Sequence, residues 1–157
     1  MAVAKGFNPD VDGRVNEYKI GAIGAGMIMA ECHLSAYKDA GFTVAAIASR
    51  TKSRAEQVAS RWGIAKVHDT PEDLIADPSI EILDIAYPPD QQPARIRAAL
   101  KEPHIKAILA QKPLALSLDE AKKLRDEAKG GVRDYSNRQG VVHREIMVPE
   151  GGAAWLA

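Results

Sequence analysis

Two closely spaced glycines, Gly24 and Gly26, constrain this chain more than any other feature. They follow an apolar run that ends at Ile23 and precede an amphipathic stretch that begins at Met27. A strand that enters a helix through such a turn is typical of dinucleotide-binding folds. The first glycine permits the tight turn, and the second lets the backbone approach a pyrophosphate at the positive end of the helix. Because a Gly-x-Gly pair is common by itself, a purely structural turn is the alternative.

Short apolar runs alternate with amphipathic runs through most of the chain. The apolar runs predict strands at 18–23, 42–48, 66–68, 80–87 and 105–110. The amphipathic runs predict helices at 27–39, 53–62, 70 onward, 91–100 and 117–129. The run at 42–48 is almost continuously apolar, as expected for a strand buried on both faces. With its short connections, the pattern predicts an α/β fold: a Rossmann-type doubly wound parallel sheet in three α/β/α layers.

Three of the predicted helices carry a start signal. The segments 53–56 and 117–120 have the Ser-x-x-Glu spacing of a capping box, in which side chain and backbone satisfy each other's hydrogen bonds. Thr70 is the predicted N-cap of a further helix, and Pro71 is its first residue. These signals set the expected beginnings of the second, third and last helices.

The composition is that of an ordinary globular chain with balanced charge. The 157 residues suit one domain with a real core. Lys plus Arg and Asp plus Glu each number 21, which gives no support for a nucleic-acid footprint or a basic membrane patch. No apolar run is long enough to span a bilayer. The single cysteine, Cys32, has no partner for an internal disulfide, so we expect a reduced, cytoplasmic compartment.

The pattern divides the chain into three parts. Residues 1–16 are mixed and polar, lack the apolar region of a secretory signal, and are predicted to be a flexible leader. Residues 17–131 carry the alternation of strands and helices and are predicted to be the nucleotide-binding domain. Residues 132–157 lose the periodicity because charged side chains interrupt any apolar face. We predict an irregular tail there.

The residues after the second predicted strand bear on the choice of nucleotide. An NAD-selective site usually carries Asp or Glu here to bind the ribose 2′-hydroxyl, whereas this chain has Ser49 and Arg50. A guanidinium pairs with a 2′-phosphate and stacks on adenine, so Arg50 favours NADP, or use of both nucleotides. The alternative is that Arg50 and Lys52 are solvated loop charges. Met29 occupies the place of the usual Gly or Ala and weakens the fingerprint without abolishing it.

Two proline-containing turns follow the fourth and fifth predicted strands. They are Pro88-Pro89 and Gln111-Lys112-Pro113. Ligands in open α/β sheets lie at the carboxyl ends of the strands, so these turns are predicted to form a stiff wall of the cleft. Lys112 is the only ionisable side chain in its turn, and partial burial would suit it to donate to a substrate hydroxyl or a developing oxyanion. An ordinary surface lysine explains the position equally well.

Metal and serine-nucleophile chemistry find no support in the residue pattern. The four histidines and Cys32 show no metal-ligand spacing, and no serine lies in a Gly-x-Ser-x-Gly elbow. We therefore predict no metal site. His33, on the first helix near the glycine turn, is predicted to be a packing or surface residue.

Five motifs occur in the order found in the Gfo/Idh/MocA oxidoreductases, the family of glucose–fructose oxidoreductase and inositol 2-dehydrogenase. They are IGAIGAGMI at 20–28, ASR at 48–50, TPEDL at 70–74, AYPPD at 86–90 and QKPLA at 111–115. The chain resembles this family over residues 18–131, and the Gln-Lys-Pro turn is its most specific feature. The resemblance implies NAD(P)-dependent hydride transfer at a carbon of a sugar, polyol or related carbinol.

The resemblance also implies roles for individual residues. Those implied to bind the cofactor are Gly24, Gly26, Met27, Ile28, Ser49, Arg50, Pro88, Pro89 and Gln111. Lys112 matches the family's catalytic lysine beside the reacting carbon, and a cis bond before Pro113 would aim its side chain. Gln111 replaces the commoner Glu. Gln92 stands where many members carry a His, which puts that contact in doubt.

The resemblance ends near residue 131. Family members continue into a second α/β domain that supplies most substrate contacts and the Asp and His of the active site, and residues 132–157 do not match it. We therefore expect a truncated chain that carries mainly the cofactor domain. The alternatives are a non-catalytic nucleotide-binding module and an inactive fragment. Apolar surface left by a missing domain favours self-association, so a homo-oligomer is a further candidate.

Overall fold

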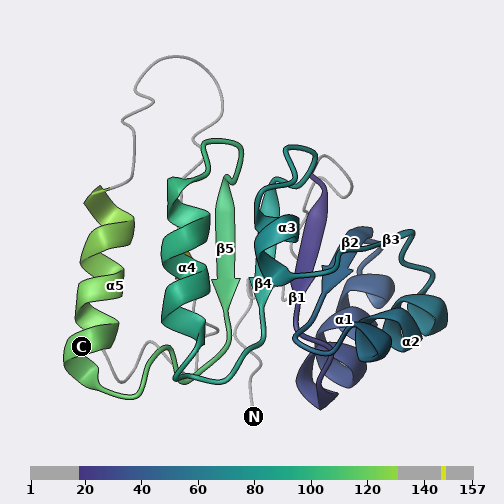
Figure 1. Cartoon of the computed structure of the whole chain (residues 1–157), viewed down its shortest axis with the longest axis horizontal. Coiled ribbons are helices and arrows are strands. Elements are labelled where there is room, and N and C mark those ends of the chain that lie inside the picture. The colour runs from purple at the N-terminus through teal and green to yellow at the C-terminus, as the bar shows by residue number, and fades with distance from the viewer. Residues whose placement is uncertain (1–17, 131–145, 148–157) are drawn as a thin grey trace, which may run out of the picture.

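Six parallel strands form one sheet in the computed structural model, which describes residues 18–130 and 146–147. The strands are β1 (Ile20–Ile23), β2 (Val44–Ala48), β3 (Lys66–Val67), β4 (Ile82–Ile85), β5 (Ala107–Ala110) and β6 (Ile146–Met147). Their order across the sheet is β3-β2-β1-β4-β5-β6 (Figure 1). The order therefore reverses between β1 and β4, which is the switch point of a doubly wound sheet.

Helices connect the strands close to the predicted positions. They are α1 (Leu34–Asp39), α2 (Lys52–Trp62), α3 (Pro71–Ile75), α4 (Gln92–Lys101) and α5 (Leu118–Gly130). The helix predicted at 27–39 is present, but its first part is a π-helix, η1 (Ile28–His33), which continues into α1. Wide turns of this kind occur frequently at functional sites, and this one directly follows the glycine turn.

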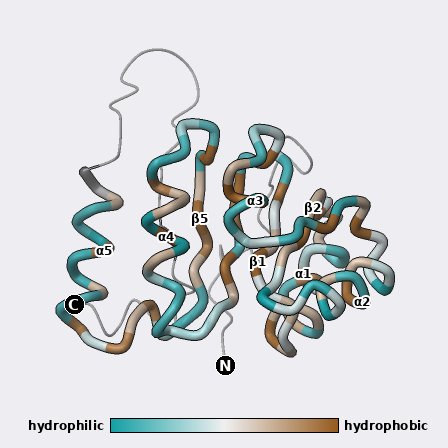
Figure 2. The backbone as a smooth tube through the Cα atoms, viewed as in Figure 1, coloured by the Kyte–Doolittle hydropathy of each residue, from teal (hydrophilic) through white to brown (hydrophobic). Residues whose placement is uncertain are grey.

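Neighbouring residues of a strand point to opposite faces of the sheet, and here both faces are buried. Ile23 and Ala48 pack in a core shared with α3, α4 and α5, whereas Ala22 and Ile47 pack in a second core with η1, α1 and α2. Figure 1 draws α3 and α4 in front of the sheet with α5 beside α4. In Figure 2, α4 alternates between hydrophobic and hydrophilic stretches, as a helix with one apolar face does. The predicted three-layer α/β/α architecture is confirmed.

The helix starts agree with the sequence in two of three cases. Thr70 caps α3 in a complete capping box with Asp73, in which each residue's side chain accepts the other's backbone N–H at 3.1 Å. The Ser117 hydroxyl accepts the Glu120 N–H at 3.2 Å at the start of α5. The Glu120 carboxylate instead accepts a bond from Arg97 at 2.7 Å.

The capping box predicted at 53–56 is wrong. Helix α2 begins at Lys52, and its N-cap is Thr51, whose side chain makes no capping bond. The Thr51 carbonyl accepts hydrogen bonds from the N–H groups of Arg54 and Ala55, so the helix begins before Ser53. The Ser-x-x-Glu spacing therefore falls inside the first turn, where a serine has no free N–H groups to cap.

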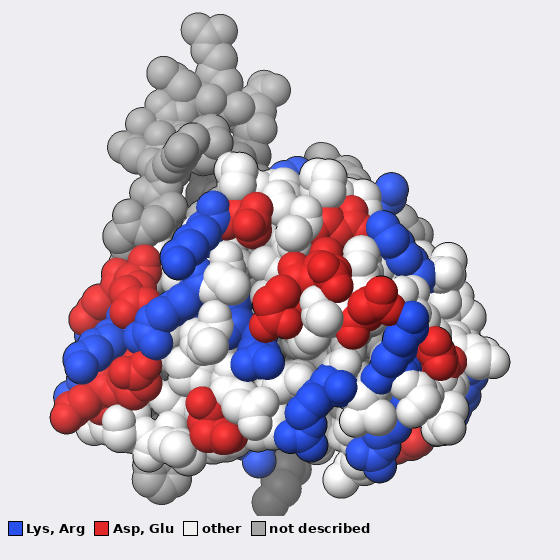
Figure 3. Space-filling view, viewed as in Figure 1, with Lys and Arg blue, Asp and Glu red and all other residues white. Residues whose placement is uncertain are grey.

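Charges of both signs are interleaved on the face that carries α4 and α5 (Figure 3). The Arg97 guanidinium binds Glu120 and Glu127 on α5, each at 2.7 Å, and so fastens α4 to α5. The hydrogen bonds that Arg97 donates to these two carboxylates raise its pKa. Positive and negative groups therefore neutralise one another locally, in line with the balanced composition of the chain.

The tail is described only at residues 146–147, which form β6. Ile146 and Met147 pair in parallel with Ile108 and Leu109 of β5. The sequence predicted no strand in this part, because a segment of two residues is too short to show a period. The leader predicted at 1–16 lies outside the described residues, and the division of the chain at 17, 131 and 132 stays a prediction.

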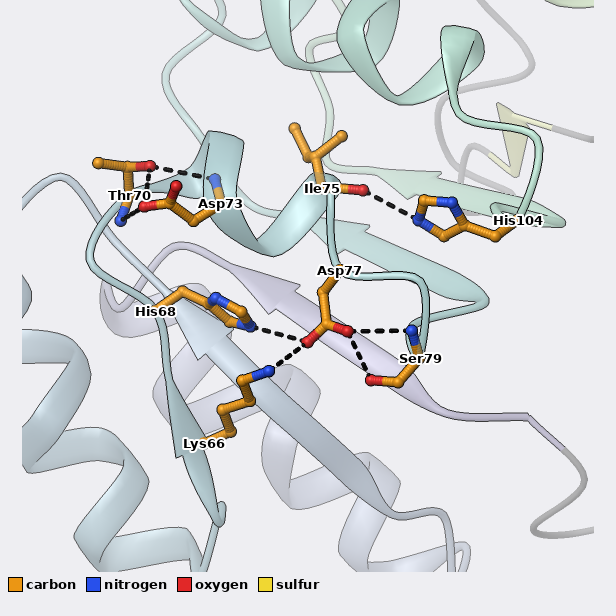
Figure 4. Close-up of polar contacts among 8 residues, drawn as sticks. All are labelled: Lys66, His68, Thr70, Asp73, Ile75, Asp77, Ser79 and His104. Carbon is orange, nitrogen blue, oxygen red and sulfur yellow. Dashed lines mark hydrogen bonds and ion pairs between the residues drawn. The ribbon is translucent and has the colours of Figure 1, made fainter.

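A buried carboxylate fastens the β3 edge of the sheet to the loop between α3 and β4. Asp77 accepts bonds from Lys66 Nζ at 2.7 Å and His68 Nε2 at 3.1 Å, and from the Ser79 N–H and hydroxyl at 2.9 and 2.7 Å (Figure 4). The Lys66 hydrogen bond, with help from Ser79, holds the pKa of Asp77 well below its ordinary value of 3.8. The ionised form of Asp77 therefore stabilises the fold.

Replacing this carboxylate with an amide should destabilise the chain in a pH-dependent way. We expect Asp77→Asn to lower the free energy of unfolding by about 1–3 kcal/mol at neutral pH, because hydrogen bonds to a charged group weaken. A lowered folded pKa contributes stability above the unfolded value of 3.8 and loses it as the pH falls toward the folded pKa. Urea unfolding of both proteins at about pH 7 and about pH 3 should give a gap that narrows in acid.

The exposed Asp39, the last residue of α1, supplies the control, because its side chain makes no hydrogen bond or ion pair within residues 18–130 and 146–147. Asp39→Asn should change the free energy of unfolding by no more than about 0.5 kcal/mol at either pH. An Asp77→Asn gap that stays constant with pH would contradict the assigned role of the ionised carboxylate.

Candidate nucleotide-binding site

The glycine turn lies at the switch point of the sheet, where β1 ends beside β2 and β4. The Gly24 N–H donates to the Ala48 carbonyl at 2.8 Å, and Gly24 has a φ of 117°. A Cβ at this position would lie 2.3 Å from the carbonyl oxygen of Ala86. The fold itself therefore requires glycine at position 24, because an L side chain would be strained and would collide with the neighbouring strand.

Gly26 differs from Gly24 because nothing crowds it. A Cβ built there would meet no atom within 4 Å, and the next side chain, Met27, is 67% exposed. The helix that starts here has no side-chain cap at Met27. Among the described residues, the N–H groups of Met27 and Ile28 at the positive end of this helix have no hydrogen-bond partner, and free N–H groups at such an end can bind a phosphate. Ile28, the first residue of η1, belongs to the same turn.

Met29 closes the turn against the sheet. Its side chain is completely buried and packs with Ala25, Leu34 and Ile47 in the core under η1 and α1. A side chain of this size has to push the helix outward or lie beside the strand. The wide π-helical turn accompanies this large residue at a place where Gly or Ala is usual, and the glycine turn keeps its form.

The end of β2 presents one buried and one exposed candidate. Ser49 is buried, and its hydroxyl accepts the Thr51 N–H at 3.5 Å. Arg50 is exposed and makes no hydrogen bond or ion pair with the part of the chain that the structure describes. Lys52 forms an ion pair with Asp69. Of the two basic residues in this loop, Arg50 is the one whose charge is available to a ligand.

The turns after β4 and β5 are joined by Gln92, the first residue of α4. Its buried side-chain amide donates to the carbonyl oxygen of Gln111 at 2.6 Å and lies 3.3 and 3.4 Å from those of Pro113 and Leu114. Gln92 thus contacts the backbone of the next turn, and the contact that a His makes at this position in many family members stays untested. Since Gln92 follows the Pro88-Pro89 turn, the two predicted walls of the cleft form one connected unit.

Lys112 lies at the surface of this unit. The peptide bond between Lys112 and Pro113 is cis, as predicted. The Lys112 N–H donates to Oε1 of the Gln111 side chain at 2.8 Å, while the Lys112 side chain is exposed. Within the described residues its ammonium has no hydrogen-bond or ion-pair partner, so both the catalytic and the surface-lysine interpretations remain.

A polar cluster that the sequence analysis missed lies beside this turn. Asp84, fully buried in β4, accepts bonds from His33 Nδ1 at 2.8 Å and from the Tyr37 hydroxyl at 2.7 Å. His33 Nε2 lies 3.0 Å from Nε2 of the Gln111 amide. The prediction that His33 merely packs or faces solvent is therefore wrong. The available signal was Asp84, a charged residue in the otherwise apolar strand β4.

Charge and burial act together on this cluster. The Asp84 hydrogen bond raises the pKa of His33 against the opposing effect of burial. Burial, with the Asp84 charge, raises the pKa of Tyr37, which stays a neutral donor. The cluster borders a cavity of about 370 Å³, whose other lining residues are Cys32, Ala36, Leu109, Ala110 and Gln111. The second carboxylate oxygen of Asp84 has no hydrogen-bond partner among the described residues.

The described residues show neither a metal-binding cluster nor a membrane-spanning helix. In residues 18–130 and 146–147, no three His, Cys, Asp or Glu side chains gather in a way that would hold a metal ion. No helix in this described part combines the length and the apolar character needed to cross a bilayer.

Residues 18–136 match the model of the GFO_IDH_MocA oxidoreductases, described as an oxidoreductase family with an NAD-binding Rossmann fold. The chain belongs to this family. The predicted family, the Rossmann fold and the general cofactor class are thereby confirmed. The Gfo/Idh/MocA relatives are considerably longer, as the comparisons below show.

Among curated proteins, an uncharacterized oxidoreductase of Rhizobium meliloti is 36% identical over 132 residues, which are 83% of this chain and 36% of that protein. The Bacillus subtilis scyllo-inositol 2-dehydrogenase (NAD(+)) is 34% identical over 57% of this chain and 25% of its own length. The chain spans about a third of the length of the first relative and a quarter of the second.

Solved structures give the same fold with either nucleotide. Myo-inositol dehydrogenase of Lactobacillus casei, in complex with NAD(H) and myo-inositol, has a TM-score of 0.67 at 26% identity, over 83% of this chain and 36% of that one. The 3-ketoreductase KijD10 of Actinomadura kijaniata, in complex with NADP, has a TM-score of 0.65 at 28% identity, over 74% and 35%. Gfo/Idh/MocA neighbours thus bind NAD or NADP.

Proposed function

We propose that this chain is the cofactor-binding part of an oxidoreductase that transfers hydride at a carbon of a sugar or polyol. The open backbone above Gly26, at the switch point between β1 and β4, is the observation that carries the proposal. Inositol dehydrogenases among the relatives support the substrate class. The nicotinamide, when bound, supplies the hydride acceptor or donor.

The proposed binding roles follow the geometry of the switch point. Gly24 shapes the turn, and Gly26, Met27 and Ile28 present the N–H groups that receive the pyrophosphate. The residues proposed to line the rest of the cofactor are Ser49 and Arg50 at the adenosine end and Pro88, Pro89 and Gln111 at the nicotinamide end. Each of these positions follows the carboxyl end of a strand, where ligands of open α/β sheets bind.

Lys112 is the proposed catalytic residue. Its ammonium is exposed and unpaired within the described part of the chain, so it is available to an oxygen on the reacting carbon. There it would donate a hydrogen bond to the hydroxyl or to the negative charge that develops during transfer. Gln92 and the Gln111 side chain fix the backbone from which it extends.

We further propose that Arg50 makes NADP the preferred cofactor. Hydrogen bonds to a charged group contribute about 1.5–3 kcal/mol, so Arg50→Asp should weaken NADPH binding by about 10–100-fold. NADH binding should weaken far less, because the new carboxylate can accept from its ribose 2′-hydroxyl. Isothermal titration calorimetry of the purified chain with each nucleotide measures both affinities and also tests for the cofactor site itself.

Lys52→Gln is the matched control, because Lys52 lies two residues from Arg50, at the start of α2, but is engaged by Asp69. It should leave the ratio of NADPH to NADH affinity unchanged. An unchanged ratio in Arg50→Asp would refute the role of Arg50. A folded wild-type chain that binds neither nucleotide would refute the proposed function and leave the glycine turn as a structural connection.

A second candidate is a nucleotide-binding module without catalysis. It is favoured by what the described residues supply, since Lys112 is their single proposed catalytic group. Hydride transfer also needs an oriented substrate and a proton acceptor, which the residues described here do not bring together beyond Lys112. Tight nucleotide binding without reduction or oxidation of any tested polyol would support this candidate.

A further inference from the structure

The cluster of His33, Tyr37 and Asp84 has no part in the function proposed so far, yet it connects directly to the turn that carries Lys112. Nε2 of the Gln111 side chain lies 3.0 Å from His33 Nε2, and Oε1 of the same amide accepts the Lys112 N–H at 2.8 Å. The Gln111 amide therefore bridges the imidazole and the backbone of the catalytic candidate.

The hydrogen-bonding capacities of these groups allow one arrangement. A backbone N–H only donates, so the Gln111 oxygen must face Lys112 for the bond to form. The amide nitrogen then faces His33, and since this nitrogen only donates, His33 Nε2 must accept. The imidazole is consequently neutral, with its proton on Nδ1.

Asp84 fixes the other side of the ring. Its carboxylate, fully buried in β4, lies 2.8 Å from His33 Nδ1 and accepts the proton there. The Tyr37 hydroxyl donates to the same oxygen at 2.7 Å, which holds the carboxylate in place. A neutral imidazole with its proton on Nδ1 satisfies Asp84 and Gln111 together, as the buried site requires.

We propose that His33 is a positioning residue for the Lys112 turn: its neutral form, held by Asp84, keeps the Gln111 amide in the orientation that binds the Lys112 N–H. The inference rests on the proposed function, because the turn matters through the role assigned to Lys112.

Protonation of His33 should undo this arrangement. An imidazolium donates from both nitrogens, so Nε2–H would face the donating amide nitrogen of Gln111. The amide must then turn its oxygen toward His33, and the Lys112 N–H loses its acceptor. The ionisable groups that face His33 in the described part of the chain are Asp84 from β4, Tyr37 from α1 and Cys32 from η1 itself. Asp84 raises the pKa of His33, so this protonation occurs at a higher pH than that of an ordinary imidazole.

NMR of the full isotope-labelled chain, without nucleotide, tests the inference. We expect the imidazole nitrogens of His33 to report the neutral Nδ1–H form at high pH. As the pH falls, the backbone amide signal of Lys112 should shift with the same midpoint as the His33 ring. A histidine that serves only in packing would titrate without moving the Lys112 amide.

Gln111→Glu separates positioning from packing. A carboxylate accepts from the Lys112 N–H and from protonated His33 at once, so the Lys112 amide should lose its inflection while the His33 midpoint moves to higher pH. His33→Gln should also remove the inflection. If that variant does not fold, Gln111→Glu still decides the question. His104→Gln is the matched control, because His104 bonds to the Ile75 carbonyl away from this turn, and it should leave the inflection unchanged.

The inference would be overturned if the backbone amide signal of Lys112 did not shift while His33 titrates in the folded wild-type chain. An inflection of this signal that persists in Gln111→Glu would also overturn it. The proposed function fails by a different result, absence of nucleotide binding in calorimetry. The two failures are therefore distinguishable, since the NMR titration needs no cofactor.

Discussion

Gly24→Ala should destabilise the chain by about 3–5 kcal/mol, from a left-handed backbone at a non-glycine residue and from overpacking. The φ of 117° is strained for alanine, and its Cβ would lie 2.3 Å from the Ala86 carbonyl oxygen. That oxygen belongs to the backbone next to β4 and cannot rotate away as a side chain would. Domains of this size have a total stability of about 5–15 kcal/mol, so urea unfolding should detect the loss readily.

Gly26→Ala is the matched comparison two residues away. Its Cβ meets nothing within 4 Å, so the free energy of unfolding should change by no more than about 0.5 kcal/mol. The added methyl group would occupy the space through which a pyrophosphate approaches, and nucleotide affinity should fall by about tenfold or more. Equal stability of Gly24→Ala and wild type would contradict the geometry of the turn. Unchanged nucleotide affinity in Gly26→Ala would contradict the proposed site.

The second large effect is expected at Asp84. Asp84→Ala removes the acceptor of two partly buried donors, His33 Nδ1–H and the Tyr37 hydroxyl. An unsatisfied buried donor costs about 1–3 kcal/mol, so the free energy of unfolding should fall by about 2–5 kcal/mol. Thermal and urea unfolding, followed by circular dichroism, would measure the loss. Tyr37→Phe removes one of the donors and leaves the His33 bond, so it should cost about 1 kcal/mol.

Asp84→Asn separates the charge of Asp84 from its shape. Protonated His33 is stabilised by the carboxylate, and because its folded pKa is raised, this contribution is complete below the ordinary value of 6.5. It is lost as the pH rises through the folded pKa of His33. The stability gap between wild type and Asp84→Asn should therefore be larger in mild acid than at high pH. A gap that grows with rising pH would show that the carboxylate does not pair with His33.

The fold followed from the sequence because each strand is a short apolar run between helices with a clear period. The stretch at 42–48 needs burial on both faces, and only a sheet covered on two sides provides it. Element ends were less certain: the predicted strand 80–87 is shortened to Ile82–Ile85, since apolar character continues past the last ladder bond. The strand β6 had no detectable signal in a segment of two residues.

In the candidate site, features that depend on consecutive residues were predicted, and contacts between distant residues were missed. Gly24 and Gly26 were found because a local backbone turn leaves its mark in consecutive residues. The pairing of His33 with Asp84 was missed because the two lie 51 positions apart and meet only through the order of β1, β4 and β5. Gln92 is similar, since a polar residue at a helix start gives no hint that it reaches three carbonyl groups of another turn.

The amide of Gln92 has a consequence for anyone who wishes to redesign this protein. This side chain extends from the start of α4, just after Pro88 and Pro89, and contacts backbone carbonyl groups on both sides of Lys112. The Pro88-Pro89 turn and the Lys112 turn therefore form one structural unit. Grafting a new proline loop onto this scaffold would also relocate the lysine, so libraries that vary one segment should vary the other in the same clones.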